Sequence, residues 1–431
     1  MTNKEFFLLY NNTCSKYSSN LFWFEKNKKI TYAEFDRLVK SVIINIAELY
    51  PKTLIINIKN PFYFAIAIIS ALCSGLKFIP VNDMLERQLI QMKVFDTIRL
   101  VDEDVKKYTS VLKYDNEVIS DYCKIGRNEI ALIAFSSGTT SLPHGVCLSY
   151  KNLIADVLSG LRSFKCLPET RYLHTLPYFH MFGIAVELLP VLLSGGTICN
   201  PASIYSVINE IPALKPNLSF CTVDFALVML SYLKKCKDPS QITKYLSILV
   251  CGGSRLDSRI SIELQKYGVL AIGAYGMTEC SPGISINSQS DYRLGSVGKT
   301  IDCCSVEVGE NSEILVKGEN VATCYLDGTP LLDSRGWFHT KDLGYFDKEG
   351  YLWITGRLDD LIVLNNGKKY SRSYVESTIK VFPDVEIVSI ECDRDSYIKC
   401  VLKAEIEIKR KKEISEYIYK IFEDAKVVFL H

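Results

Sequence analysis

The chain has little of what defines several large protein classes. It has only five histidines, and its 15 cysteines are scattered without a Cys-x-x-Cys pair, so the sequence predicts neither a zinc site nor a disulfide framework. Its 50 basic and 49 acidic residues nearly cancel, which leaves no electrostatic footprint for nucleic acid. We therefore expect partners that are small or recognised locally, and no nucleic acid among them.

The sequence also has little that would carry it into or across a membrane. Residues 1–6 lack the basic start and apolar stretch of a signal peptide. The most apolar segment, residues 61–76, is interrupted by Ser70 and Ser74 and is shorter than the roughly 20 residues of a membrane span. We expect a buried helix there, no membrane span, and a cytoplasmic location in which the cysteines stay reduced.

What is present is an alternation of apolar strand-like runs with amphipathic segments. This alternation indicates parallel sheets covered by helices, and the length leaves room for roughly three domain-sized units. The expected strands are residues 54–58, 77–81, 130–135, 247–250 and 269–274, and the expected helices are residues 62–76 and 151–164.

From about Asp302 the pattern changes to short strands and turns. Strands are expected at residues 305–308, 313–316 and 351–354, at 360–364 and 368–371 around Asn366-Gly367, and as a hairpin of 385–391 with 397–407, before a closing helix at 412–424. The predicted fold class is therefore α/β. A large N-terminal domain of helix-covered sheets with a small β-rich subdomain (residues 1–356) is followed by a small α+β C-terminal domain (357–431).

The stretch 130–146 leads from a buried strand into small hydroxyl residues and glycine. Glycine lets the backbone approach an anion, hydroxyls donate hydrogen bonds, and successive N–H groups form an anion-binding nest. An ordinary turn has a similar composition, although the order of residues here is much rarer. The loop lacks the Gly-Lys-Ser/Thr ending of a P-loop ATPase. The candidate phosphate-binding residues are Ser136, Ser137, Gly138, Thr139 and Thr140.

Three later clusters follow expected strands or aromatic pairs. The paired glycines Gly252 and Gly253 would let a flat ring lie against the backbone, although a plain glycine turn explains them equally well. Glu279, two residues after Gly276-Met277, offers a carboxylate of the kind that binds Mg²⁺ beside phosphates, with a solvated loop residue as the alternative. Asp342 follows an aromatic pair and is suited to accept hydrogen bonds from sugar hydroxyls.

In this order, the motifs resemble the adenylate-forming superfamily of acyl-CoA synthetases, peptide-synthetase adenylation domains and beetle luciferases. Two of them, Tyr-Gly-Met-Thr-Glu and Gly-Trp-Phe-x-Thr-x-Asp-x-Gly, are close to the family consensus. The resemblance extends over nearly the whole chain and is strongest to fatty-acid and aryl-acid acyl-CoA synthetases. The blocks that carry it are residues 135–145, 178–183, 251–256, 275–279, 295–298, 313–318, 337–344 and 356–360.

The resemblance implies a two-step reaction that needs ATP and Mg²⁺. A carboxylate attacks the α-phosphate of ATP to give an acyl-adenylate and pyrophosphate, and a thiol of coenzyme A or of a phosphopantetheinyl carrier protein then displaces AMP. In such enzymes the small C-terminal domain is mobile and rotates between the steps, about a hinge residue that matches Asp359. Residues 1–356 would then form the AMP-binding domain and residues 357–431 a lid.

The resemblance also implies roles for individual residues. Thr278 would contact the α-phosphate, Glu279 would bind Mg²⁺, and both would be catalytic together with His180. Fixed donors and a metal would meet the charge that spreads over the phosphate oxygens. The implied ATP-binding residues are Ser136, Ser137, Gly138, Thr139 and Thr140 at the phosphates, Gly252, Gly253, Ser254, Tyr275, Gly276 and Met277 around adenine, Thr278, and Asp342 with Arg357 at the ribose.

The chain departs from the family pattern at three places, one of which is the segment after the hinge, where Arg372 and Tyr374 replace a proline and a glutamate that the family often has. Ser141 and His144 replace a glycine and a lysine of the phosphate loop, and a neutral histidine supplies less positive charge than lysine. The family motif Pro-Lys-Thr-x-x-Gly-Lys has no counterpart, because no glycine follows Gly367 and no proline follows Pro383. One alternative is therefore a homologue that binds ATP or acyl-adenylate without the full reaction.

One block of the resemblance narrows the chemical class of the acid substrate. Amino-acid-activating relatives carry an aspartate where this chain has His180, which disfavours an amino-acid adenylation domain. An apolar pocket walled by Phe182, Gly183, Val223 and Ala274 would favour a fatty or aromatic acid. Without the resemblance, His180 could equally be a histidine that is packed in the core.

Overall fold

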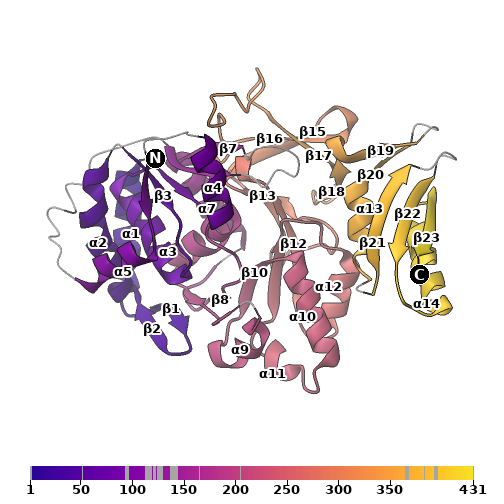
Figure 1. Cartoon of the computed structure of the whole chain (residues 1–431), viewed down its shortest axis with the longest axis horizontal. Helices are drawn as coiled ribbons and strands as arrows, with labels where there is room; N and C mark the ends of the chain where they lie inside the picture. Colours follow the sequence, from indigo (N-terminus) through magenta and orange to yellow (C-terminus); the bar gives the residue numbers. More distant parts are fainter. Residues whose placement is uncertain are drawn as a thin grey trace.

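The computed structural model shows the α/β architecture that the alternation predicts (Figure 1). Two sheets with helices against them occupy most of the chain, a four-stranded antiparallel sheet follows, and a small unit of strands and helices comes last. The structure describes residues 2–50, 52–92, 97–111, 119, 123, 130–135, 144–164, 166–203, 205–364, 368–382, 384–392 and 397–430.

The first sheet has five strands and is mostly parallel. Its strands are β3 (Thr53–Ile56), β4 (Phe78–Pro80), β5 (Thr97–Leu100), β6 (Ile130–Phe135) and β7 (Gly145–Ser149). The order is β5-β3-β4-β6-β7, in which only the β6–β7 pairing is antiparallel. Every residue of β3 is buried, as expected for a parallel strand covered on both faces. The strands predicted near residues 54–58, 77–81 and 130–135 are confirmed.

The second sheet has nine strands. They are β1 (Leu21–Glu25), β2 (Lys28–Thr31), β8 (Arg171–Leu173), β9 (Thr197–Cys199), β10 (Leu218–Thr222), β11 (Ile248–Gly252), β12 (Leu270–Gly276), β13 (Gly283–Ile286) and β14 (Lys299–Thr300). The order is β14-β13-β12-β11-β10-β8-β9-β1-β2, parallel from β12 to β1 and antiparallel at both ends. β11 and β12 confirm the strands predicted at residues 247–250 and 269–274.

Helix α3 (Pro61–Ser74) is the most apolar segment of the chain, and it is a core helix as predicted. Asn60 caps its first turn by accepting hydrogen bonds from two backbone N–H groups, and Gly75 ends it with a φ of 74°. Residues 64–74 are buried without interruption, so the helix is surrounded on all sides. Among the described helices, none combines the length and the apolar character that crossing a bilayer requires.

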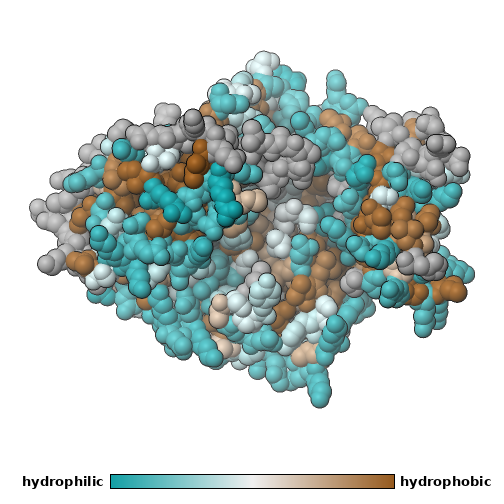
Figure 2. All heavy atoms as spheres, viewed as in Figure 1, coloured by the Kyte–Doolittle hydropathy of each residue, from teal (hydrophilic) through white to brown (hydrophobic). Residues whose placement is uncertain are grey.

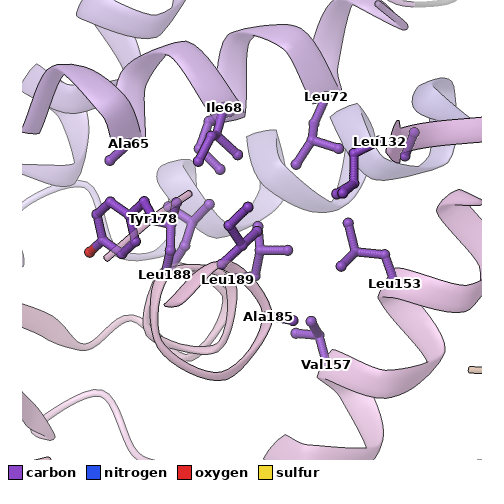
Figure 3. Close-up of a cluster of buried hydrophobic side chains, with 14 of the residues drawn as sticks. Ala65, Ile68, Leu72, Leu132, Leu153, Val157, Tyr178, Ala185, Leu188 and Leu189 are labelled. Atoms are coloured by element: carbon purple, nitrogen blue, oxygen red, sulfur yellow. The ribbon is translucent and has the colours of Figure 1, made fainter. Parts of the chain in front are cut away.

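The layer between the two sheets is one continuous apolar core. Figure 3 shows Ile68 of α3 pointing toward Leu188 and Leu189, while Leu72 lies beside Leu132 of β6, with Leu153 of α7 (Tyr150–Phe164) below them. This core includes side chains from both sheets, so burial of shared apolar surface holds the sheets together. The other helices around the sheets are α1 (Asn3–Lys16), α2 (Tyr32–Ile46), α4 (Asp83–Met92), α5 (Asp102–Ser110), α8 (Leu189–Ser194), α9 (Val207–Leu214), α10 (Val223–Lys235), α11 (Ser240–Thr243) and α12 (Ser258–Gln265).

The change of pattern near Asp302 corresponds to an antiparallel sheet. Its strands are β15 (Cys304–Val308), β16 (Glu313–Gly318), β17 (Phe338–Phe346) and β18 (Leu352–Arg357), each paired with the next. The register places Asp342 opposite Arg357. The predicted β-rich subdomain is therefore confirmed, and its last two strands bring together two residues that are distant in the sequence.

The C-terminal unit has its own hydrophobic core. Its elements are β19 (Leu361–Val363), β20 (Lys369–Ser371), α13 (Arg372–Ile379), β21 (Glu386–Cys392), β22 (Ile398–Lys403), α14 (Ile408–Ile421) and β23 (Ala425–Leu430). Both predicted hairpins form, β19 with β20 and β21 with β22. The turn residues Asn366 and Gly367 lie outside the described residues. Asp359 lies in the short turn between β18 and β19, and its role as a hinge, like the domain boundary, stays a prediction.

The prediction of a closing helix at residues 412–424 is wrong in its bounds and in its place. Helix α14 begins at Ile408 and ends at Ile421, and it is followed by β23, which pairs in parallel with β22. The run Val427-Val428-Phe429 is rich in β-branched and aromatic side chains, which suit a strand that has a partner to pair with. Strand β22 also ends at Lys403, earlier than residue 407.

Candidate functional site

Three neighbouring parallel strands end together at one edge of the nine-stranded sheet. Strands β10, β11 and β12 align so that Thr222 pairs with Gly252 and Cys251 pairs with Gly273. The residues that follow β10 and β11, beginning with Val223 and Gly253, therefore lie beside the last residues of β12. In α/β proteins, ligands bind at the carboxyl ends of parallel strands, often between loops of this kind.

Hydrogen bonds connect a carboxylate to a phenol and to a guanidinium group at the end of β12. Tyr275 donates its hydroxyl hydrogen to Asp342 Oδ2 at 2.6 Å, and Arg357 Nη1 donates to Asp342 Oδ1 at 3.0 Å. Asp342 is 8% exposed. Burial raises its pKa, and the bond from Tyr275 and the charge of Arg357 oppose that rise. Each carboxylate oxygen can accept a further bond, so the group can receive hydroxyl donors from a ligand.

A second buried carboxylate, Glu279, follows β12 directly in the short 3₁₀ helix Thr278–Cys280. It is 8% exposed, and burial raises its pKa. Its Oε1 accepts a long hydrogen bond of 3.5 Å from the Tyr325 hydroxyl, and the Tyr325 ring lies 5.8 Å from the His144 ring. A carboxylate that is buried with so weak a partner is costly when charged. Oxygen ligands of this kind suit a divalent cation, which would relieve that cost.

The helix Phe182–Leu188, which follows β8 along the chain, begins with an aromatic ring that lies against the end of β11. A Cβ built on Gly252 would lie 2.9 Å from Phe182 Cζ, so glycine lets the ring and the backbone approach. Gly183 fits as closely, 2.6 Å from the carbonyl oxygen of Pro177 on the same measure. His180 is exposed rather than packed in the core, and partial burial of its ring lowers its pKa. The imidazole is therefore mainly neutral near neutral pH.

A family model described as AMP-binding enzyme matches residues 74–326, more than half of the chain. The chain belongs to the AMP-binding enzyme family. The matched part includes the predicted phosphate loop, His180, Gly252, Glu279 and Tyr325, and it ends before Asp342 and Arg357.

This AMP-binding enzyme is similar to several curated ligases. It is 26% identical over 307 residues to an indoleacetate–CoA ligase of Aromatoleum aromaticum, covering 66% of this chain and 58% of that protein. It is 28% identical over 387 residues to a 2-succinylbenzoate–CoA ligase of Bacillus cytotoxicus, covering 83% of this chain and 79% of that protein. The chain thus spans less than two thirds of the length of the indoleacetate–CoA ligase.

The fold is also similar to solved structures. One is the o-succinylbenzoate CoA synthetase of Bacillus subtilis in complex with its acyl-adenylate intermediate, with a TM-score of 0.78 and 20% identity, covering 100% of this chain and 94% of that chain. At this identity the likeness concerns the fold. It shows that the arrangement of sheets described above is shared with that solved structure.

Several of the predicted site residues of this AMP-binding enzyme are neighbours in the structure. Tyr275 and Arg357 each donate a hydrogen bond to Asp342. The charges of Arg357 and Asp342 act on the pKa of Glu279 in opposite directions, which places Glu279 in the same electrostatic neighbourhood. Gly252 touches Phe182. The roles assigned to these side chains stay predictions.

The remaining predicted site residues differ in how exposed they are, and some of them lie outside the described residues. Val223 is buried and Ala274 half-buried, whereas Gly253 and Ser254 are exposed. Gly276 is exposed, and Met277 and Thr278 are half-buried between β12 and Glu279. The predicted phosphate-binding residues Ser136, Ser137, Gly138, Thr139 and Thr140 lie outside the described residues.

Sequence reasoning missed Tyr325, which contacts Glu279 from 46 residues away. Tyr325 pairs with Val146 in an antiparallel bridge, so it reaches the site through β7. No local pattern signals such a residue, because its place depends on pairing between remote segments. Together with His144 it connects Glu279 to the chain that leaves the predicted phosphate loop.

The AMP-binding enzyme also has a cavity of about 700 Å³ apart from these residues. Segments that follow β3, β4, β8 and β9 line it, at the carboxyl edges of both sheets, and none of the predicted site residues is among them. In its wall, His174 Nδ1 lies 2.5 Å from Glu187 Oε1, and Tyr178 donates to the same oxygen at 2.9 Å. Glu187 Oε2 is buried without a hydrogen-bond partner among the described residues. Nothing in the sequence pattern pointed to this cluster.

Proposed function

We propose that this AMP-binding enzyme activates a carboxylic acid with ATP and transfers the acyl group to a thiol. A carboxylate oxygen of the acid would form a bond to the α-phosphorus of ATP while the bond to pyrophosphate breaks. The thiol sulfur would then bond to the acyl carbon, and AMP would leave with the bridging oxygen. The observation that carries the proposal is the bonded group of Tyr275, Asp342 and Arg357 beside the buried Glu279, at the carboxyl edge of β12.

In this proposal Asp342 accepts hydrogen bonds from the two ribose hydroxyls of ATP. Tyr275 and Arg357 already bind one oxygen each and fix the orientation of the carboxylate before the nucleotide arrives. Preorganised acceptors lose little freedom when the ligand binds, which favours affinity. Arg357 is itself held by Asp359 through bonds of 2.9 and 3.1 Å.

Glu279 would hold the cation that accompanies ATP. When bound, Mg²⁺ would supply positive charge to the phosphate oxygens. The part played by the chain is to offer a carboxylate that lies 8% exposed, with the Tyr325 hydroxyl 3.5 Å from Oε1 as the partner that orients it. Because burial raises the pKa of Glu279, a neighbouring cation would favour the charged form that coordination requires.

The acid would bind beside Phe182, where the ring lies against Gly252. The predicted pocket walls Phe182, Gly183, Val223 and Ala274 are apolar and the neighbouring His180 is mainly neutral, so none of these residues offers a carboxylate to an amino-acid ammonium group. An aromatic acid is favoured over a fatty acid, because the similar proteins carry the names indoleacetate–CoA ligase, feruloyl-CoA synthase and 2-succinylbenzoate–CoA ligase. The same names favour coenzyme A over a carrier protein as the thiol.

The test is to incubate the full chain with ATP, Mg²⁺ and a panel of aryl, fatty and amino acids, and to detect acyl-adenylate and pyrophosphate by mass spectrometry. Acyl-adenylate with aryl acids, converted to a thioester when coenzyme A is added, is the expected result. Glu279→Gln should abolish product, whereas Glu405→Gln, an exposed glutamate of the C-terminal unit, should not. Binding of ATP without product from any acid would favour the alternative of a homologue that only binds the nucleotide or the adenylate.

A further inference from the structure

Two arginines next to the candidate site lie against aromatic rings of the C-terminal unit. The guanidinium carbon of Arg255 is 4.0 Å from the centre of the Tyr374 ring. That of Arg259 is 4.0 Å from the Tyr417 ring and 4.9 Å from the Phe382 ring. Tyr374 belongs to α13, Phe382 follows it, and Tyr417 belongs to α14. The short segment 255–259, which leads from β11 into α12, thus contacts both helices of the C-terminal unit. This unit lies beside α12 in Figure 1.

These guanidinium groups are desolvated where they meet the rings. Arg255 Nε and Arg259 Nη1 are buried and have no hydrogen-bond partner among the described residues. A buried N–H without an acceptor is costly, whereas a planar guanidinium over an aromatic face is favourable, more so when water is excluded. The aromatic faces therefore cover part of these two half-buried arginines, and removing the rings would lose the cation–π contacts.

Asp257, between the two arginines, joins the same contact with a hydrogen bond. Its Oδ1 accepts from the Arg259 N–H at 2.8 Å and so caps the start of α12, and its Oδ2 accepts from the Tyr417 hydroxyl at 3.2 Å. Asp257 is buried. The C-terminal unit is thus attached to the first turn of α12. A change in the position of the unit would therefore also change the hydrogen bonds that cap this helix.

Arg255 follows directly after residues 252–254, the segment predicted to enclose adenine. Gly253 has a φ of 79°, so the backbone turns there in the left-handed region that favours glycine. We propose that Arg255 and Arg259 are positioning residues: they seat the C-terminal unit on the segment between β11 and α12, and they couple this docking to nucleotide binding at residues 252–254. The coupling, though not the docking, rests on the proposed function. Linkage is reciprocal, so whatever factor docking adds to nucleotide affinity, nucleotide adds to docking.

Docking is tested without any nucleotide, by hydrogen–deuterium exchange of the full chain. The double variant Arg255→Ala, Arg259→Ala should exchange about tenfold faster at the start of α12 and at α13 and α14, because desolvated cation–π contacts are lost. Arg410→Ala is the matched control, since Arg410 lies 5.3 Å from the same Phe382 ring but belongs to the C-terminal unit itself. It should leave exchange at α12 unchanged. Retained protection of the β21–β22 hairpin shows that the unit of the double variant is still folded.

Wild-type exchange at α12 in the double variant would overturn the docking role. A second variant, Arg255→Lys with Arg259→Lys, keeps both charges and removes the planar groups, and it should behave like the alanine pair. If the lysine pair instead matches the wild type, the planar guanidinium group is not what seats the unit, and the proposal in this form fails.

The coupling is tested by calorimetric titration of the same variants with ATP. The double variant should bind ATP roughly five- to tenfold more weakly than wild type, within the usual range of coupling between sites, and Arg410→Ala should bind it equally well. Faster exchange at α12 together with unchanged ATP affinity would overturn the coupling and leave the docking intact. If the wild-type chain binds no ATP, the proposed function fails, and the exchange result still decides the docking.

Discussion

At the scale of single residues, the candidate site depends on two carboxylates that the fold takes out of water. Asp342 has partners on both oxygens, whereas Glu279 is oriented by one long bond from Tyr325. Burial raises the pKa of both groups, and the pairing with Arg357 opposes the rise at Asp342. These different surroundings support the different roles proposed for the two side chains, Asp342 as a fixed acceptor and Glu279 as a ligand of a cation.

Replacing Asp342 by alanine is predicted to weaken ATP binding by about 1–3 kcal/mol, the cost of losing a charged hydrogen-bond acceptor. Titration calorimetry with ATP measures the change. Asp347→Ala is a control just after β17, because Asp347 accepts a hydrogen bond of 3.0 Å from the Trp353 indole at the far end of the β17–β18 ladder. It should lower the stability and leave ATP affinity unchanged. Equal affinity of wild type and Asp342→Ala would remove Asp342 from the ribose site.

The raised pKa of Glu279 predicts a pH dependence of Mg²⁺-ATP binding. Because burial disfavours the charged form, Glu279 takes up a proton at a higher pH than an exposed glutamate, and the chain then loses its cation ligand. Affinity for Mg²⁺-ATP should therefore fall with decreasing pH, beginning above the usual range of glutamate. In Glu279→Gln the binding should be weak and nearly independent of pH over that interval. A wild-type profile identical to that of the variant would contradict the assignment.

Sequence reasoning reached some residues and not others for a physical reason. Asp342, Glu279 and Gly252 stand in short runs whose residue types are constrained together, so the pattern is visible locally. Tyr325 and Arg255 act through contacts with remote strands or with another unit, and only the folded chain shows them. The sequence left two alternatives for His180, a site residue or a histidine packed in the core, and its exposed position removes the second.

At the scale of elements, the strands that end at the site were predictable and the last strand was not. β6, β11 and β12 are apolar runs bounded by glycine or turn residues, which mark a strand without knowledge of its partners. β23 has similar residues, but its pairing with β22 across α14 is a long-range choice. The neighbouring end of α14 was misplaced for the same reason.

The contact between β11 and Phe182, the first residue of the helix Phe182–Leu188, predicts the effect of Gly252→Ala. The new Cβ would lie 2.9 Å from Phe182 Cζ and push the ring toward the acid site, so kcat/KM for adenylate formation should fall on the order of 10²-fold. Phe182→Leu in the same chain should restore part of the activity by making space. Gly160→Ala is the control, because Gly160 lies in α7 and a Cβ at this position would meet nothing within 4 Å. Full activity of Gly252→Ala would show that the ring lies elsewhere.

The buried Asp156 carboxylate joins helix α7 to strand β13. Replacing Asp156 by alanine or by asparagine distinguishes the effect of its charge from the effect of its hydrogen bond. Asp156 accepts from the Gly283 N–H at 2.9 Å, and burial raises its pKa well above the usual range. Asp156→Ala should lower the free energy of unfolding by about 1–3 kcal/mol, because the donor is left unpaired. Asp156→Asn keeps an acceptor and carries no charge, so its stability relative to wild type should increase as pH rises through the raised pKa. Urea unfolding at several pH values measures both, and equal losses in the two variants would contradict this explanation.

At the scale of the whole molecule, one apolar core holds two parallel sheets so that their carboxyl edges face a common region (Figure 1). Figure 2 shows polar side chains over most of the outer surface on this view, with a hollow between the N-terminal half and the C-terminal unit. The alternation of strands and helices predicted this class of fold, since it depends on local periodicity. The order of strands in each sheet, and the contact of Arg255 and Arg259 with the C-terminal unit, depend on packing between distant segments and were beyond local pattern.

The central claim is that the carboxylate of an acid attacks the α-phosphate of ATP. The most direct measurement uses an aryl acid labelled with heavy oxygen in its carboxyl group, together with ATP, Mg²⁺ and coenzyme A, and analyses the nucleotide product by mass spectrometry. If attack occurs as proposed, AMP carries one heavy oxygen, because the bridging oxygen stays with phosphorus when the thiol takes the acyl group. Release of unlabelled AMP, or of ADP instead of AMP, would contradict the account.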